Sequence, residues 1–405
     1  MKRSTHSCIF FALVLAGCEG VSVNVLDGPR TCGTPSPGDV SAQPADLFVN
    51  AFGIKPGGIS AAEPLMKERL SELGVRQMVL PYGDDREDCR RLVNALGLKG
   101  LITIDVLADA MPALQFYGSA ATAITLRNNL PIDATWGEGV RRNQQALFEL
   151  VKGNDTTGSI SVVGTNIQSD EQIRLAGDLS AWVDAGSFFP WRTELWRDPP
   201  GRRVQTDLPR HIPTYGTRRM VAPQTGYDTD PENGVSESIA GRYVVRTLLE
   251  HFRSGVQRTF IADFADNAPE SPEIASSGIG ILHNDGSPKP AFITLSRLMA
   301  LIGDAGPAFV PGQLGYSLGT SSAAVHTILL QKRSGTFYLL LWLEIDSVET
   351  ETVVPVTLEL AVPAKALTVF RPAQASAPVL LSKGQRISVD VPDSLTVLQI
   401  ERDCP

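Results

Sequence analysis

Short apolar runs alternate with longer amphipathic stretches between about residues 47 and 302. The short runs are bounded by turn residues, as buried strands are, whereas the longer stretches repeat their apolar positions at helical spacing. We expect strands at 48–52, 75–80, 101–104, 123–126, 160–163, 186–189, 220–224 and 259–264. We expect helices at 64–73, 85–96, 134–152, 179–183, 236–254 and 289–302. Strands that alternate with helices over roughly 250 residues predict an α/β fold of the (β/α)8 type, a TIM barrel.

The pattern changes at residues 303–312, where Pro307, Pro311 and three glycines interrupt it. Helical periodicity then disappears, and strand-like runs are separated by turn residues. We expect strands at 325–330, 336–343, 351–359, 367–370, 379–381, 385–391 and 395–401. The sequence therefore predicts a barrel over residues 46–303 and an antiparallel β-sandwich over residues 308–405.

The N-terminus has the features of an export signal. Lys2 and Arg3 precede an apolar run at 8–15, and Leu-Ala-Gly leads to Cys18. The run is too short to span a bilayer. The tetrad resembles a bacterial lipobox, which implies that residues 1–17 are removed and that Cys18 carries the lipid; cleavage by an ordinary signal peptidase is the alternative. Residues 18–45 then form a tether, which places the protein at the outer membrane or cell surface.

Composition and charge exclude some functions. The chain has 405 residues and a formal net charge of −8, which argues against a nucleic-acid partner. Its five histidines are isolated, so we expect no metal and no cofactor. Export implies an oxidising compartment. With Cys18 lipidated, Cys32, Cys89 and Cys404 allow at most one disulfide; we favour Cys32–Cys404, although sequence alone leaves the pairing open.

The segment Met220–Tyr227 reads Met-Val-Ala-Pro-Gln-Thr-Gly-Tyr, an apolar run that ends in a polar tip and a glycine turn. It resembles the seventh strand of clan A glycoside hydrolases, the retaining enzymes that include xylosidases and iduronidases. The resemblance continues through residues 234–237, 248–252, 255–260 and 285–292. It implies a TIM barrel with a C-terminal β-sandwich, a carbohydrate partner and two catalytic carboxylates about 5–5.5 Å apart. The family's nucleophilic glutamate falls at Gln224.

The family's other carboxylate lies at the tip of the fourth strand. Residues 126–131 read Leu-Arg-Asn-Asn-Leu-Pro where the family has Glu-Gly-Pro-Asn-Glu-Pro, so Asn129 matches and the acid/base position holds Leu130. A neutral amide is a very poor nucleophile and a hydrocarbon has no proton to donate. The family's strand-six histidine is also replaced, by Phe189, and its strand-two arginine is absent. We therefore expect a catalytically impaired barrel that still binds saccharide.

The candidates for saccharide contacts are amide, aromatic and acidic residues at predicted strand ends: Asn129, Trp136, Trp191, Gln224, Tyr227 and Asp263. Amides exchange hydrogen bonds with hydroxyl groups, and aromatic faces can stack on sugar rings. Each has a structural alternative. Trp136 and Tyr227 are equally compatible with packing, and Asp263 with an ion pair to an arginine such as Arg258.

Two other functions are compatible with the sequence. An active hydrolase would need relocated carboxylates, for which Asp105, Asp133, Glu138 and Asp263 are the candidates. Two of them facing each other at about 6.5–9.5 Å would permit an inverting reaction. A structural or adhesive surface protein would instead have a barrel mouth plugged by side chains. The acidic side chains that line the barrel mouth distinguish these three hypotheses.

Overall fold

A computed structural model describes residues 38–58, 60, 63–127, 132–133, 135–190, 197–229, 234–267, 278–374, 377–381 and 384–402. The predicted signal peptide, Cys18, Cys32 and Cys404 lie outside these residues, as do the candidates Asn129, Leu130 and Trp191. Cys89 is described, and it is a buried free cysteine. In the described part of the chain, no helix is both long enough and apolar enough to cross a bilayer.

Eight parallel strands form one curled sheet in the order β7-β6-β5-β4-β3-β10-β9-β8. They are β3 (Phe52–Ile54), β4 (Gln77–Pro81), β5 (Lys99–Ile104), β6 (Ala121–Leu126), β7 (Ser161–Val162), β8 (Gly186–Ser187), β9 (Met220–Thr225) and β10 (Arg258–Ile261). A parallel bridge between Val163 and Ala185 joins the two outermost strands, so the sheet closes on itself. The predicted TIM barrel is confirmed.

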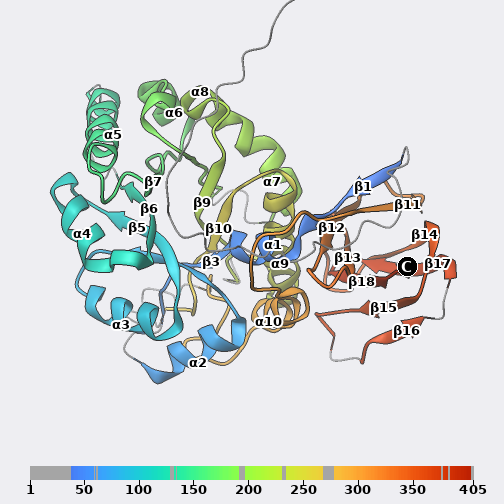
Figure 1. Cartoon of the computed structure of the whole chain (residues 1–405). Coiled ribbons are helices and arrows are strands. Elements are labelled where there is room, and N and C mark those ends of the chain that lie inside the picture. The colour runs from blue at the N-terminus through green and yellow to red at the C-terminus, as the bar shows by residue number, and fades with distance from the viewer. Residues whose placement is uncertain are drawn as a thin grey trace, which may run out of the picture.

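Helices cover the outside of this barrel (Figure 1). They are α2 (Pro64–Leu73), α3 (Arg86–Leu96), α4 (Ala110–Tyr117), α5 (Trp136–Lys152), α6 (Asp170–Ala176), α7 (Pro200–Asp207), α8 (Ile212–Tyr215), α9 (Glu237–Arg253) and α10 (Pro290–Ile302). Short 3-10 turns lie at Leu107–Asp109, Gly118–Ala120, Ser180–Trp182 and Leu208–His211. Helix α2 starts at a proline and is followed by Gly74 at φ 68°, a left-handed position that glycine adopts without steric cost.

The first predicted strand, 48–52, is wrong over most of its length. Helix α1 (Ala45–Ala51) occupies it, and strand β3 begins only at Phe52. The buried residues Ala45, Phe48, Val49 and Phe52 recur at the i, i+3, i+4, i+7 spacing of a helix face. The sequence did not reveal this spacing, because the residues between these positions are also mostly apolar and a short apolar run fits a buried strand equally well.

The interior of the barrel is filled by side chains. Seven buried residues from seven positions around the sheet form one cluster: Val79, Leu101, Ala123, Val163, Ala185, Val221 and Phe260. Phe260 fits because its neighbour on β3 is Gly53, where a Cβ atom would lie 2.4 Å from the Phe260 ring. This layer closes the barrel from below, so a ligand can enter only above it, at the carboxyl ends of the strands.

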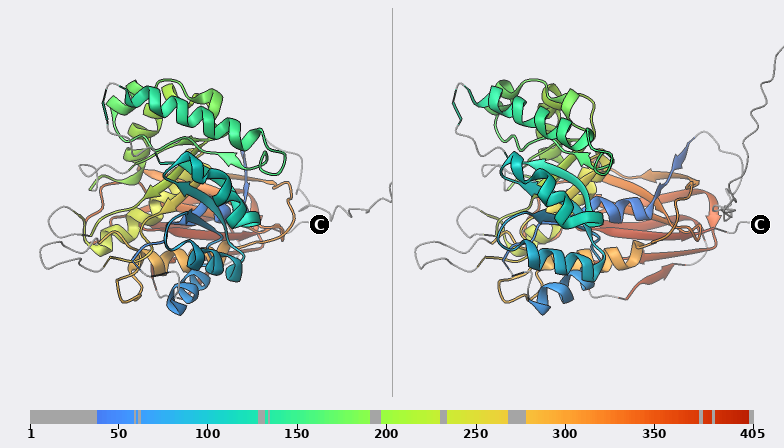
Figure 2. Two further views of the ribbon diagram at one scale, coloured as in Figure 1. Left: turned by 90° about the vertical axis from the view of Figure 1, so that its left-hand side faces the viewer. Right: turned by 60° about the vertical axis from the view of Figure 1, so that its left-hand side comes forward.

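The part of the chain that follows the barrel is the predicted antiparallel β-sandwich. Its strands are β11 (Gln313–Gly319), β12 (Val325–Gln331), β13 (Phe337–Leu343), β14 (Val353–Ala364), β15 (Ala366–Phe370), β16 (Val379–Leu381), β17 (Gly384–Pro392) and β18 (Thr396–Glu401). They form a four-stranded sheet, β1-β11-β14-β17, and a six-stranded sheet, β16-β15-β18-β13-β12-β2. The views in Figure 2 show this module standing beside the barrel.

Two strands of the sandwich come from the segment that we expected to be tether. β1 (Asp39–Ser41) pairs antiparallel with β11, and β2 (Gln43–Pro44) pairs parallel with β12. Residues 39–44 are too short and too polar for a strand signal, and the long-range pairing supplies what the local sequence lacks. The chain thus crosses the sandwich before it enters the barrel.

Helix α9 faces the sandwich, and buried charges join the two modules there. Arg246 on α9 is fully buried and lies 2.9 Å from Glu344, just after β13. Arg242 pairs with Asp393 at 3.2 Å. Trp342 of β13 is fully buried and donates its indole N–H to Glu250 of α9 at 2.9 Å. Figure 1 shows α1, α9 and α10 lying between the barrel and the sandwich.

Candidate functional site

A polar cavity lies at the carboxyl ends of the barrel strands, above the apolar layer. Its volume is about 50 Å³. It is lined by Lys55, Val79, Thr103, Thr125, Arg127, Asn166, Ser187, Phe189, Pro223 and Gln224. These residues lie on seven of the eight strands or in the segments that follow them, so the barrel itself gathers them at one point. We refer to this space as the mouth cavity.

Gln224 reaches the mouth cavity from the end of β9, as its place after a buried run predicts. The strand buries Met220, Val221 and Ala222, whereas Pro223 and Gln224 are only partly buried and line the cavity. Phe189 lines it as well, directly after β8. Both residues therefore line the mouth cavity, and neither carries an ionisable group.

The described lining of the mouth cavity contains no carboxylate and two cations. Lys55 follows β3, and its ammonium Nζ lies 2.7 Å from Oδ1 of Asp263. Arg127 follows β6, and its Nη2 lies 2.7 Å from Oδ2 of Asp105. The acid candidates Asp263 and Asp105 are thus partners of the cations rather than lining residues. Asp263 does form an ion pair, but with Lys55, while Arg258 donates to the Thr122 hydroxyl.

Asp263 is held tightly in place. Its side chain is about one-tenth exposed and also accepts from Nδ2 of Asn267 at 3.3 Å. The loop after β3 passes directly over it, because Gly57 has no Cβ; one placed there would lie 2.7 Å from the Asp263 carboxyl carbon. Asp263 therefore fixes the position of the Lys55 ammonium group.

The other two relocated-carboxylate candidates lie on the surface. Asp133 is exposed and accepts hydrogen bonds from the hydroxyl and the backbone N–H of Thr135 at 2.7 and 2.8 Å. These bonds lower the pKa of Asp133, the side-chain bond most strongly. Glu138 is an exposed residue in the first turn of α5. Neither residue lines the mouth cavity as described.

The two aromatic candidates that the structure describes are packing residues. Trp136 is 2% exposed and belongs to a core cluster with Val140. Tyr227 is 1% exposed, its hydroxyl donates to the Asp198 carbonyl at 2.9 Å, and Arg203 lies over its ring. Burial raises the pKa of Tyr227 to about 12. In the described structure, the packing alternative therefore holds for both side chains.

Several lining residues were missed in the sequence. Asn166 lies a few residues after β7, and Ser187 is the last residue of β8. Each of these strands is only two residues long. Strands this short leave no alternating pattern that would mark the residue at their end. Ser187 Oγ and Asn166 Oδ1 are buried and have no hydrogen-bond partner among the described residues, so both atoms are available to a polar group in the cavity.

One group of side chains in the described part of the chain has the composition of a metal site. Ligand atoms of Glu250, His326 and Glu344 lie within 4.8 Å of one another. Each carboxylate already has protein donors: Trp342 and His326 at Glu250, and Arg246 and the Gly201 N–H at Glu344. The cluster is far better explained as the polar joint between barrel and sandwich than as a cation site.

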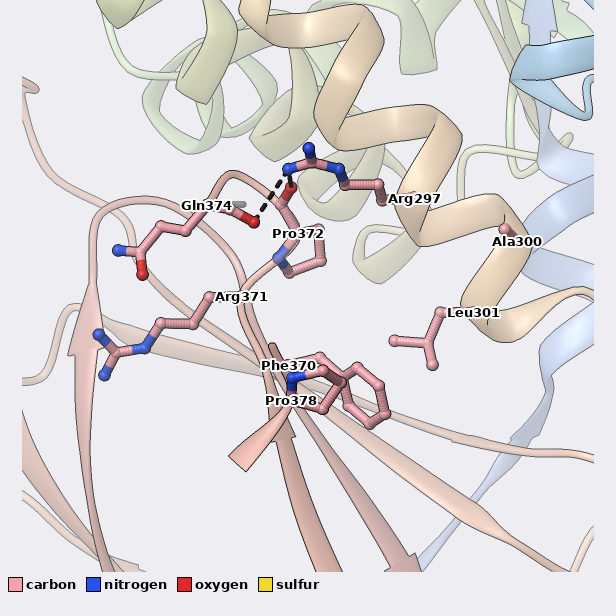
Figure 3. A pocket seen from close by; sticks show the side chains of 8 residues that line it. All are labelled: Arg297, Ala300, Leu301, Phe370, Arg371, Pro372, Gln374 and Pro378. Atoms are coloured by element: carbon pink, nitrogen blue, oxygen red, sulfur yellow. Dashed lines mark hydrogen bonds between the residues drawn. The ribbon is translucent and has the colours of Figure 1, made fainter. Parts of the chain in front are cut away.

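A larger hollow of about 340 Å³ lies away from the mouth, between α10 and the end of β15 (Figure 3). Phe370, Leu301 and Pro378 form its apolar walls. Arg297 donates to the carbonyls of Pro372 and Gln374 at 3.0 and 2.9 Å, and Figure 3 shows its guanidinium group directed at that turn. Arg371 is directed away from the hollow. Arg297 therefore serves the contact between the two modules, whereas Arg371 donates to the Asp390 carbonyl within the sandwich at 3.2 Å.

Comparison with known proteins agrees with this architecture. No protein-family profile and no curated sequence matches the chain. A family 39 glycoside hydrolase from the gut symbiont Bacteroides cellulosilyticus WH2 superimposes with a TM-score of 0.58 at 12% identity, over 89% of this chain and 81% of that chain. A glucosidase from Croceicoccus marinus gives 0.57 at 12% identity, over 90% and 98%. The chain has a glycoside hydrolase-like fold, a TIM barrel with a C-terminal β-sandwich.

Proposed function

We propose that this chain is an exported saccharide-binding protein that keeps the glycoside hydrolase fold and has lost hydrolysis. One observation carries the proposal: Gln224 stands at the tip of β9 in a mouth cavity whose described lining has no carboxylate. Retaining hydrolysis needs a carboxylate nucleophile and a second carboxyl group as acid and base. Removing one such group typically costs several orders of magnitude in rate.

The same lining is suited to binding. Gln224, Asn166 and the hydroxyls of Thr103, Thr125 and Ser187 offer both donors and acceptors. Saccharide hydroxyl groups need such mixed partners when they leave water. In the described structure, Ser187 Oγ and Asn166 Oδ1 have no protein partner and are available for hydrogen bonds to saccharide hydroxyl groups. The structural alternative requires a mouth plugged by side chains, with no cleft of the few hundred Å³ that ligand sites usually have. The mouth cavity of about 50 Å³ is below that size, so this alternative stands beside the binding proposal and the titration described next decides between them.

The proposal is tested with wild-type protein and a Gln224→Ala variant. We expect no turnover of chromogenic glycosides by either protein, and saccharide binding by the wild type in calorimetric titration against a glycan panel. Loss of one hydrogen-bonding amide should weaken that binding by about three- to tenfold. Gln257→Ala, an exposed position before β10, is the matched control and should bind as the wild type does. Turnover that survives Gln224→Ala would contradict the proposal.

The alternative of relocated carboxylates is examined with the same substrates. If the chain hydrolyses glycosides through Asp105 and Asp263, then Asp105→Asn and Asp263→Asn would each abolish the activity. We expect instead that there is no activity to abolish, because both carboxylates are held by Arg127 and Lys55.

Lipid attachment at Cys18 is a further part of the proposal and rests on the Leu-Ala-Gly-Cys tetrad alone. In a bacterial host that processes lipoproteins, wild-type protein should enter the detergent phase on Triton X-114 partition. Cys18→Ser should shift it to the aqueous phase, because a diacylglycerol anchor requires the thiol. Ser4→Ala, in the predicted signal, is the control. Equal partition of wild type and Cys18→Ser would refute the anchor.

A further inference from the structure

The size of the mouth cavity limits what can enter it. Sites that enclose a small-molecule ligand usually measure about 300–1,000 Å³, whereas the mouth cavity measures about 50 Å³. On this measure of volume, one water molecule needs about 10–15 Å³. The cavity therefore has room for a group of only a few heavy atoms. A saccharide bound at this barrel would place one substituent in the cavity while its ring stays outside.

The two cationic side chains in the lining of the mouth cavity favour an anionic substituent. Lys55 and Arg127 are the ionisable groups in its described lining, and they enter from β3 and β6, which are separated by two strands of the sheet. An ammonium group has three N–H donors and a guanidinium group has five, and each ion pair accounts for one of them. Both cations thus retain donors for an anion placed between them.

Neutral donors complete the cavity. Ser187 is 1% exposed and its hydroxyl has no partner. The Thr103 hydroxyl and the Gln224 amide line the same space. In a hydrolase the residue at the position of Gln224 would be a carboxylate, which would repel an anion. Here that repulsion is absent, because an amide carries no charge.

We propose that the mouth cavity binds the anionic substituent of an acidic saccharide, a carboxylate or a sulfate group, between Lys55 and Arg127. The inference rests on the proposed function, since it specifies which saccharides that site prefers. Asp263 and Asp105 act as positioning residues that hold the two cations at the cavity. Charge-assisted hydrogen bonds to both cations and the Ser187 hydroxyl hold the anion.

The test uses three glycosides with the same ring and one simple anion. Methyl glucoside, methyl glucuronoside, methyl glucoside 6-sulfate and inorganic sulfate are titrated into the full chain by calorimetry. We expect at least one acidic glycoside to bind about tenfold or more tightly than the neutral one at low ionic strength. This advantage should shrink as sodium chloride is added, because the cations are partly exposed. Comparison of the two acidic glycosides distinguishes carboxylate from sulfate.

Substitutions then assign the preference to the cavity. Lys55→Met and Arg127→Met should each reduce the preference for the acidic over the neutral glycoside, measured as the ratio of their two affinities, by about tenfold. Lys67→Met, an exposed lysine on α2, is the control. Because Lys55→Met leaves the buried Asp263 unpaired, a Lys55→Met/Asp263→Asn variant is measured beside it, with its melting temperature as a check on folding.

Each outcome decides the question. Equal affinity for neutral and acidic glycosides overturns the anionic preference and leaves the proposed saccharide binding intact. An acidic preference that survives both methionine substitutions also overturns it. Binding of inorganic sulfate without any advantage for an acidic glycoside means an adventitious ion only, and it counts against the inference. If no glycoside binds, both the inference and the proposed function fall.

Discussion

Replacing Arg246 with methionine is expected to lower the free energy of unfolding by about 3–5 kcal/mol, the usual cost of removing one partner from a buried ion pair. The Arg246 guanidinium is fully buried and donates to Glu344, the Ser347 hydroxyl and the Ile345 carbonyl at 2.8–2.9 Å. Methionine fills similar space but removes the charged donor of the Glu344 carboxylate, which is about 5% exposed and keeps the Gly201 N–H. Urea unfolding followed by circular dichroism measures the change.

The structure offers a matched control at the same boundary. Arg202 on α7 pairs with Asp346 at 3.0 Å, one residue from the Arg246 contacts, but both side chains are more than half exposed. Exposed pairs contribute about 0–1 kcal/mol, so Arg202→Met should leave the unfolding curve nearly unchanged. A second variant, Arg246→Met/Glu344→Leu, should regain part of the lost stability, because no unpaired charge remains. Equal effects of Arg202→Met and Arg246→Met would show that burial does not determine the energetics of this joint.

The barrel was predictable from sequence because its strands carry their own signal. β4, β5, β6 and β9 are buried over most of their length and read as short apolar runs between turn residues. Helices α2 and α3 end at Gly74 and Gly97, which both adopt left-handed backbone angles. Local sequence and final fold agree at these positions, and the predicted and observed bounds differ there by at most two residues.

The elements that sequence reasoning missed depend on distant partners. Helix α7 has polar residues around most of its circumference, yet it buries Arg203, which contacts the Gly226 carbonyl and the Tyr227 ring. Such a helix has no apolar stripe to find. Strands β1 and β2 have three and two residues and are defined by pairing with β11 and β12, hundreds of residues away. No local window of sequence contains that information.

The residues of the candidate site also fall into those that the sequence could place and those that it could not. Gln224 could be placed at the barrel mouth because it follows a clear buried strand, and the structure puts it in the mouth cavity. Trp136 and Tyr227 could not be separated from packing residues, since an aromatic side chain near a strand end looks the same whether it faces a ligand or the core. Lys55 was missed because its importance comes from Asp263, which lies 208 residues further along the chain.

Lowering the pH from about 6.5 to 4 is expected to destabilise the protein through two buried histidines. Burial lowers the pKa of His251 to about 3, with the Arg203 charge adding to the effect. Burial also lowers the pKa of His211 to about 4; Arg210 adds to this and Asp170 opposes it. In the unfolded chain both rings take up a proton near pH 6.5. The unfolded state therefore binds more protons throughout this window, so stability rises with pH and is lost on acidification, by about 1.4 kcal/mol per pH unit for each histidine.

Carboxylates with lowered pKa values, such as Asp133, also make the protein less stable on acidification. The histidine contribution is therefore measured by comparing wild type and variant in the slope of unfolding free energy against pH. His251 Nδ1 lies 2.9 Å from the Thr259 hydroxyl, and asparagine can reproduce that hydrogen bond without a titrating ring. Between pH 4 and 6, His251→Asn should reduce the slope of unfolding free energy against pH by about 1.4 kcal/mol per unit, whatever its effect at pH 7. Gln257→Ala, at an exposed position with no titrating group, should leave the slope at that of the wild type. Parallel curves for wild type and His251→Asn would mean that His251 is protonated in the folded protein and that its burial does not exclude the charge.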